Sequence, residues 1–198
     1  WFVPALVEKA QVLASAGDWE QAIETAERAI AAEPQNLDAL RIVAQHLLSH
    51  DAKPADAVRS LEALAALMLR IEPHNPELYY SFSRPFARLA GRNSDVLRQT
   101  LALVERAHKL APALCAYASE VGYQQMLLGQ LADASATLRR AGQLEGGSEV
   151  VVALQMRVGI LMGDLDEASQ QLDFVTATQT SRSADVALCG ALLARRQT

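Results

Sequence analysis

The sequence predicts an all-α fold built from stacked helix-turn-helix repeats, and two observations carry this prediction. First, a glycine and the alanine that follows it recur at a fixed spacing. Gly129 and Gly163 are 34 positions apart, and so are Ala134 and Ala168. Second, the chain is rich in alanine and leucine but only 5% aromatic, a composition that suits closely packed helices better than sheets. A constant period of this length is typical of solenoids in which each repeat is one pair of helices.

The length of the period indicates the kind of repeat. About 34 residues are expected for a tetratricopeptide repeat. Carried along the chain, the register predicts about five such repeats and a C-terminal helix, wound into a right-handed superhelix. We expect one domain, 1–198, cut from a longer helical-repeat protein. Its predicted parts are repeats 3–36, 37–75, 76–112, 113–147 and 148–180, and a terminal helix 184–196.

The first repeat has the residues expected of such a unit. Pro4 suits the first turn of a helix, where its missing N–H leaves no hydrogen bond unmade. Gly17 ends the first helix, and Trp19 opens the second. Small residues then recur at steps of four and three and share one helix face, which lets the paired helix approach closely: Ala22, Ala26 and Ala29.

Two segments depart from the period. The closing prolines Pro34 and Pro73 are 39 positions apart, and one added turn in a long second helix, 55–71, accounts for most of the excess. In the third repeat, Pro85 lies inside a helix, where it removes a backbone hydrogen bond and predicts a kink. Ser94 is the expected N-cap of the helix that follows.

Composition excludes several classes of function. A net charge of −5 argues against a nucleic-acid-binding surface, which needs clustered lysine and arginine. No apolar run reaches the ~20 residues that cross a bilayer, so we expect no direct membrane insertion. Cys115 and Cys189 are too few and too far apart for a disulfide framework or a zinc site, and we expect buried, inert thiols.

The sequence offers little that could carry chemistry. His46 and His50 lie four apart on one helix, but no third ligand is near and the glutamate of a zinc-protease motif is missing between them. His108 is expected near a helix C-terminus, where positive charge is favourable. Gly122 does not belong to a phosphate loop, because the required glycine-lysine spacing is absent. We therefore expect no catalytic residue, metal, cofactor or small-molecule substrate.

The surface left for function is the concave face of the stack, which is formed mainly by the first helix of each repeat. Side chains of arginine, tyrosine and glutamine on that face could meet an acidic or helical partner, although ordinary surface residues would give the same pattern. In the predicted register, the exposed positions of this face include Arg41, Gln45, Arg88, Tyr123 and Arg157.

Several runs resemble one family more specifically than the repeat consensus does. They are 4–9 (PALVEK), 18–21 (DWEQ), 24–26 (ETA), 90–92 (AGR), 103–107 (LVERA), 120–124 (EVGYQ) and 170–174 (QQLDF). In order and spacing they are similar to the large tetratricopeptide-repeat subunit of the intraflagellar transport A complex, the tetratricopeptide repeat protein 21 family.

This resemblance implies a non-catalytic scaffold that acts in retrograde intraflagellar transport and in ciliary entry of membrane-protein cargo. The implied partners are other subunits of the complex, many of which have β-propeller and helical-repeat parts. The implied location is the cilium or flagellum, the basal body and the cytoplasm.

Three alternatives remain open from the residues. The chain could be a repeat adaptor of another multisubunit complex, or a module that regulates an attached enzyme. It could also be a chaperone-docking domain that clamps an acidic C-terminal peptide. Such domains resemble one another in a lysine and an asparagine on their first helix, and here Val7 and Gln11 stand in those places, so the clamp is missing.

Overall fold

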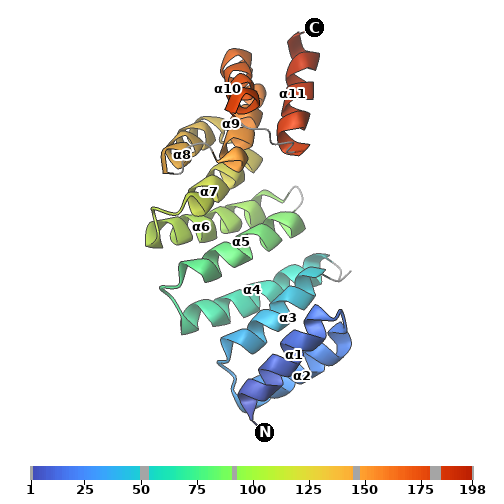
Figure 1. The fold of residues 1–198 in the computed structure, drawn as a ribbon. Coiled ribbons are helices and arrows are strands. Elements are labelled where there is room, and N and C mark those ends of the chain that lie inside the picture. Colours follow the sequence, from blue (N-terminus) through green and yellow to red (C-terminus); the bar gives the residue numbers. More distant parts are fainter. Residues whose placement is uncertain (1, 50–53, 91–92, 145–147, 179–183, 198) are drawn as a thin grey trace. The chain divides into compact units, whose positions relative to one another are not determined.

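The computed structural model describes residues 2–49, 54–90, 93–144, 148–178 and 184–197, and these form a series of α-helices joined by short turns (Figure 1). The chain divides into two compact units, 1–89 and 90–198, which we call unit 1 and unit 2. The helices up to the unit boundary are α1 (Val3–Ser15), α2 (Trp19–Ala32), α3 (Leu37–Ser49), α4 (Pro54–Ile71) and α5 (Pro76–Ala90).

In unit 1, helices pack in the pattern expected of helical repeats. Helix α1 contacts α2, its partner in the first repeat, and also α3, the first helix of the second repeat. Alanines at the contact points are fully buried, as the spacing predicted: Ala22, Ala26 and Ala29. The predicted long second helix is confirmed, because α4 has 18 residues; it begins at Pro54, one residue earlier than expected, where proline suits the first turn.

Unit 2 repeats this arrangement with six helices in the part of the chain that the structure describes. Each helix contacts the next, and α7 and α9, the first helices of successive repeats, also touch, as do α9 and α11. The helices are α6 (Ser94–Leu110), α7 (Cys115–Leu127), α8 (Leu131–Leu144), α9 (Glu149–Met162), α10 (Leu165–Thr178) and α11 (Ala184–Gln197).

Helix α9 is apolar around most of its circumference, and neighbouring helices bury much of it. It contacts α7, α8, α10 and α11, and a helix that is hydrophobic all round is typical of a buried position. On one side, Met156 joins Cys189 and Leu193 of α11 in a core cluster. Helix α11 therefore covers part of α9.

One cap differs from the prediction. The N-cap of α6 is Asn93, and Ser94 is already the first helical residue, so the prediction for Ser94 is wrong. Asn93 has the extended backbone that a cap requires, with φ −76° and ψ 103°. Its side-chain oxygen accepts hydrogen bonds from the backbone N–H groups of Asp95 at 3.0 Å and Val96 at 3.4 Å.

Some features of the predicted architecture stay predictions. Pro85 lies within α5, a single α-helix, and the kink expected there is not tested. The same holds for the grouping of the chain as one domain and for the hand of its superhelix.

Three turns depend on glycine for a conformational reason. Gly17, Gly129 and Gly163 have backbone φ angles of 84°, 76° and 83°, a left-handed conformation that strains residues with a Cβ atom. In all three turns the glycine follows the first helix of a repeat, and one residue separates it from the second helix. The 34-residue period in glycine therefore reflects a repeated left-handed turn.

Replacing Gly163 by alanine is expected to lower the free energy of unfolding by about 1 kcal/mol, because alanine must then adopt the left-handed conformation. Crowding plays no part, since nothing lies within 4 Å of a Cβ built there. The control is Gly142→Ala in α8, where the nearest atoms lie at an ordinary 3.5 Å. This change is expected to raise the free energy of unfolding by about 0.5–1 kcal/mol, because alanine favours a helix more than glycine does. Urea unfolding measures the free energy of unfolding of both variants. Changes of the same sign would contradict the left-handed conformation assigned to Gly163.

Candidate functional site

Two neighbouring hollows run along the first helices of unit 1. The first has a volume of about 450 Å³ and lies mainly between α1 and α3. The second, of about 470 Å³, lies between α3 and α5, with Met68 of α4 in its wall. Arg41 and Gln45 line both, so the structure brings these two predicted residues together on one surface, which we call the unit 1 groove. Its other lining residues are Gln11, Ala14, Ser15, Trp19, Asp38, Ile42, Ala44, Met68, Glu77, Ser81 and Phe82.

Arg41 carries a charge that a partner could use. Its Nη1 lies 3.1 Å from Oδ1 of Asp38, one helical turn earlier, and the two side chains are 44% and 57% exposed. Exposed ion pairs of this kind contribute little to stability, because solvent screens the charges and the side chains lose entropy. Arg41 can therefore exchange Asp38 for a carboxylate of a partner at small energetic cost.

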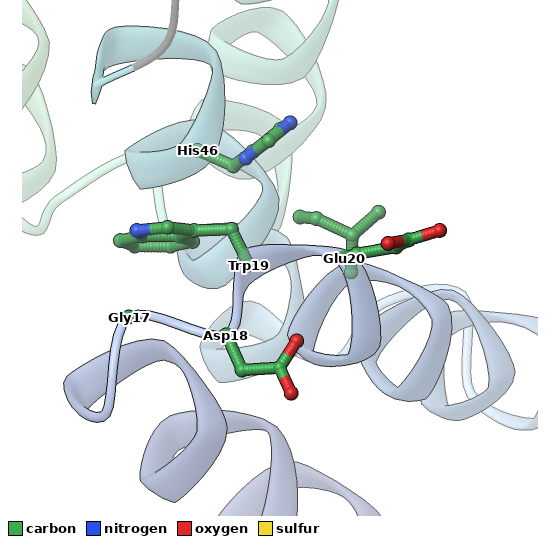
Figure 2. A pocket seen from close by; sticks show the side chains of 6 residues that line it. Gly17, Asp18, Trp19, Glu20 and His46 are labelled. Carbon is green, nitrogen blue, oxygen red and sulfur yellow. The ribbon is translucent and has the colours of Figure 1, made fainter.

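A third hollow, of about 590 Å³, lies beside the turn between α1 and α2, where Trp19 meets His46 (Figure 2). Trp19 comes from the start of α2 and His46 from α3; the ring centroids are 5.8 Å apart and the planes are tilted by 39°. Figure 2 shows the imidazole above the indole and the carboxylate of Asp18 on the other side of the turn. His46 therefore contributes to the packing between α2 and α3. His50 lies outside the described residues.

Asp18 has a structural task at the same turn. Its Oδ1 accepts a hydrogen bond from the backbone N–H of Gln21 at 3.3 Å, and its Oδ2 accepts one from the side-chain amide of Gln21 at 2.7 Å. This is the N-cap of α2. Of the two carboxylates that line the third hollow, those of Asp18 and Glu20, the first therefore holds the helix end.

Two of the remaining predicted residues lie in the other unit. Tyr123 and Arg157 belong to unit 2, on α7 and α9, and both are half-buried. Tyr123 packs against the core cluster that contains Leu138 and Leu154. Arg88 lies in α5, but its side chain is outside the described part of the structure. A contact role for all five predicted residues stays a prediction.

Sequence reasoning missed several residues of the unit 1 groove. Asp38 precedes Arg41 by three positions, and the helical spacing of Asp38, Arg41 and Gln45 was a usable signal for one exposed face. Glu77 and Phe82 could not be found this way, because they come from another helix and reach the groove only through packing. Phe82 is 3% exposed, so the groove has an apolar wall beside its charges.

The two cysteines lie in unit 2. Cys115 and Cys189 are buried thiols that form no disulfide, and their burial agrees with the prediction. Their Sγ atoms face the carbonyl oxygens of Ala141 at 3.4 Å and Ala153 at 3.8 Å. Within the described ranges, no group of three or more histidine, cysteine, aspartate or glutamate side chains is placed to hold a metal ion. None of the described helices is long and apolar enough to cross a membrane.

Known structures establish the fold. A thermophilic tetratricopeptide-repeat protein of Thermus thermophilus superposes on the chain with a TM-score of 0.65 and 23% sequence identity, over 97% of this chain and 99% of the other. A general tetratricopeptide-repeat model matches residues 3–46. The predicted all-α tetratricopeptide-repeat solenoid is therefore confirmed.

Proteins of similar sequence identify the family more specifically than the structural matches do. Tetratricopeptide repeat protein 21B of Homo sapiens is 32% identical over 198 residues, which is 99% of this chain and 15% of the relative. Tetratricopeptide repeat protein 21A of Mus musculus is 33% identical over 180 residues, 91% of this chain and 14% of the relative. The chain thus spans about one seventh of these relatives. The model of the second ARM domain of tetratricopeptide repeat protein 21 matches residues 59–198. The chain belongs to the tetratricopeptide repeat protein 21 family.

Proposed function

We propose that the chain is a non-catalytic scaffold segment of the intraflagellar transport A complex, which supports retrograde transport and ciliary entry of membrane-protein cargo. The observation that carries the proposal is the similarity to tetratricopeptide repeat protein 21B across 99% of the chain. The solenoid fold adds support, because stacked repeats offer extended binding surfaces.

The proposed partners are other subunits of that complex, with β-propeller and helical-repeat parts, and the proposed location is the cilium, basal body and cytoplasm. On this chain, the unit 1 groove is the proposed contact surface. It combines an exposed arginine with an apolar wall formed by Met68 and Phe82. Such a surface suits a partner segment that carries both an acidic and an apolar side chain.

The chaperone-docking alternative is not favoured by the structure. Val7 stands where such domains carry a charged clamp residue, and it is only 7% exposed. It packs in a core cluster with Leu6, Ala29 and Ala39. A clamp that needs this position to face a carboxylate therefore has no place on α1.

Affinity purification of the tagged full-length protein from ciliated cells tests the proposal. We expect mass spectrometry to recover subunits of the intraflagellar transport A complex with the wild-type protein. Arg41→Glu should reduce recovery of the partner that contacts the unit 1 groove, because it reverses the charge there.

The control is Arg98→Glu in α6. Arg98 also pairs with an aspartate three positions earlier, Asp95, and its side chain is 64% exposed against 44% for Arg41, but it lies outside the groove. Recovery with this variant should equal that of the wild type. If the wild-type protein recovers no subunit of the complex, the proposed function is wrong. Equal recovery with both variants would leave complex membership intact and would rule out the groove as its contact surface.

A further inference from the structure

Helix α11 has an exposed apolar face on the side away from the core cluster that holds it to α9. Val186, Cys189 and Leu193 of α11 lie in that cluster. On the opposite side Leu188 is 51% exposed, and the three alanines around it are exposed as well. We call this set the outer face of α11: Ala187, Leu188, Ala191 and Ala194. A helix that is apolar on two sides is typical of one that packs between neighbours.

The positions of Ala187 and Ala191 recur at the repeat spacing in other first helices, four residues apart in each. The residues at these positions are buried in all of these helices: Leu6 and Ala10 of α1, Leu40 and Ala44 of α3, Ala118 and Gly122 of α7, and Val152 and Met156 of α9. In α11 the pair is also apolar, but it is exposed.

The second helix of the same repeat covers this pair in the other repeats. Ala10 of α1 packs in a cluster with Ala26 of α2. A Cβ at Gly122 of α7 would lie 2.6 Å from Cγ of Leu138 of α8. Met156 of α9 packs with residues of α10 in the same way. The outer face of α11 is therefore the surface on which a second helix packs.

We propose that a following helix of the same polypeptide packs on the outer face of α11 and completes a sixth repeat. In three repeats the second helix begins sixteen residues after the first, at Trp19, Leu131 and Leu165, so this helix begins at about position 200. Members of the family have the length for it, since this chain spans about one seventh of its relatives. The inference concerns the repeat architecture and is independent of the proposed function.

The size and composition of the outer face favour a tethered helix over a separate protein. The face consists of one leucine and three alanines, whereas stable interfaces between proteins bury about 1,200–2,000 Å². The two helices of a repeat are joined by only two or three residues in the repeats that contain α1, α7 and α9. A helix held by such a turn has a high effective concentration, so a small apolar contact is sufficient.

Cysteine labelling of the full-length protein, purified as a monomer, tests whether the outer face is covered. Ala191→Cys should react with a maleimide at least about tenfold more slowly than the control, Ala136→Cys, at an exposed alanine within α8. The native Cys115 and Cys189 are buried, so they add little background, and mass spectrometry locates the label. Equal labelling rates for the two variants would show that the face is open and overturn the proposal.

A disulfide experiment on the same protein identifies what covers the face. Gly122 and Leu138 face each other and are sixteen positions apart, so a cysteine sixteen positions after Ala191→Cys should form an intramolecular disulfide with it under mild oxidation. The control cysteine stands eighteen positions after Ala191→Cys, about 200° around the following helix, and should stay reduced.

Three results of the disulfide experiment would contradict the proposal. They are an intermolecular disulfide, labelling of Ala191→Cys that slows as protein concentration rises, and no disulfide beyond that of the control. The first two would assign the cover to a second copy of the chain, and the third to a different segment. Each overturns the proposal whatever the purification experiment yields.

Discussion

Gly122→Leu is expected to lower the free energy of unfolding by roughly 1–3 kcal/mol, because it overpacks the contact between α7 and α8. A Cβ atom at position 122 would lie 2.6 Å from Cγ and 2.7 Å from Cδ2 of Leu138. Leu138 is fully buried, so it cannot swing into solvent to make room. The two helices must separate or Leu138 must leave its preferred rotamer, and both responses disturb the core of unit 2.

Alanine variants at two glycines provide the matched control for this contact. Gly190 in α11 also faces a leucine, Leu172, but its Cβ would lie at an ordinary 3.5 Å. Gly190→Ala should therefore be neutral or slightly stabilising, since alanine favours the helix. Gly122→Ala should be destabilising despite the same gain in propensity. Urea unfolding measures all three variants, and an unchanged midpoint for Gly122→Leu would contradict the close approach of the helices.

The part of the fold that follows from repetition was predictable from the sequence. The 34-residue step from Gly129 to Gly163 predicted stacked pairs of helices, and both glycines lie in left-handed turns between the two helices of a pair. Small residues spaced along one face of 19–32 predicted a close helix contact, and Ala22, Ala26 and Ala29 are fully buried. These residues are informative because few side chains satisfy their positions: a crowded crossing needs a small residue, and a left-handed turn favours glycine.

The residue that caps the N-terminus of α6 was less predictable from the sequence. Asn93 and Ser94 are adjacent, and both have side chains that can cap a helix. The choice depends on which residue keeps an extended backbone, and this is set by how the chain enters α6. Sequence pattern alone fixes such a boundary only to within one or two residues.

The candidate sites were the least predictable feature. Arg41 and Gln45 share one helix face, so their proximity followed from spacing. A hollow in unit 2 is lined by residues of α6, α7 and α8, and one of them, His108, was predicted only as a helix-end residue. It does lie in the last turn of α6, where a cation is favourable. Its additional position beside Gln125 arises from packing between α6 and α7, which no periodicity within one helix reveals.

Met156→Ala is expected to have the larger effect of two methionine substitutions on α9, lowering the free energy of unfolding by about 2–5 kcal/mol. Met156 is 0% exposed and belongs to a cluster that joins α9 to α10 and α11. Removing its side chain leaves a cavity among neighbours that can collapse only partly, so the lost burial is not recovered. Met162, at the end of the same helix, is 50% exposed, and Met162→Ala should stay within about 0.5 kcal/mol of the wild type.

Hydrogen exchange locates the effect of Met156→Ala within unit 2. In stacked repeats each helix pair is stabilised mainly by its neighbours, so a cavity under α11 should release α11 before it affects helices farther along the stack. We expect faster amide exchange in α11 of the Met156→Ala variant, with protection in α6 retained. Because Val186, Cys189 and Leu193 anchor α11 to this cluster, exchange in α11 reports directly on whether it covers the apolar surface of α9. Equal exchange in α11 for the Met156→Ala and Met162→Ala variants would show that α11 is not held by this core.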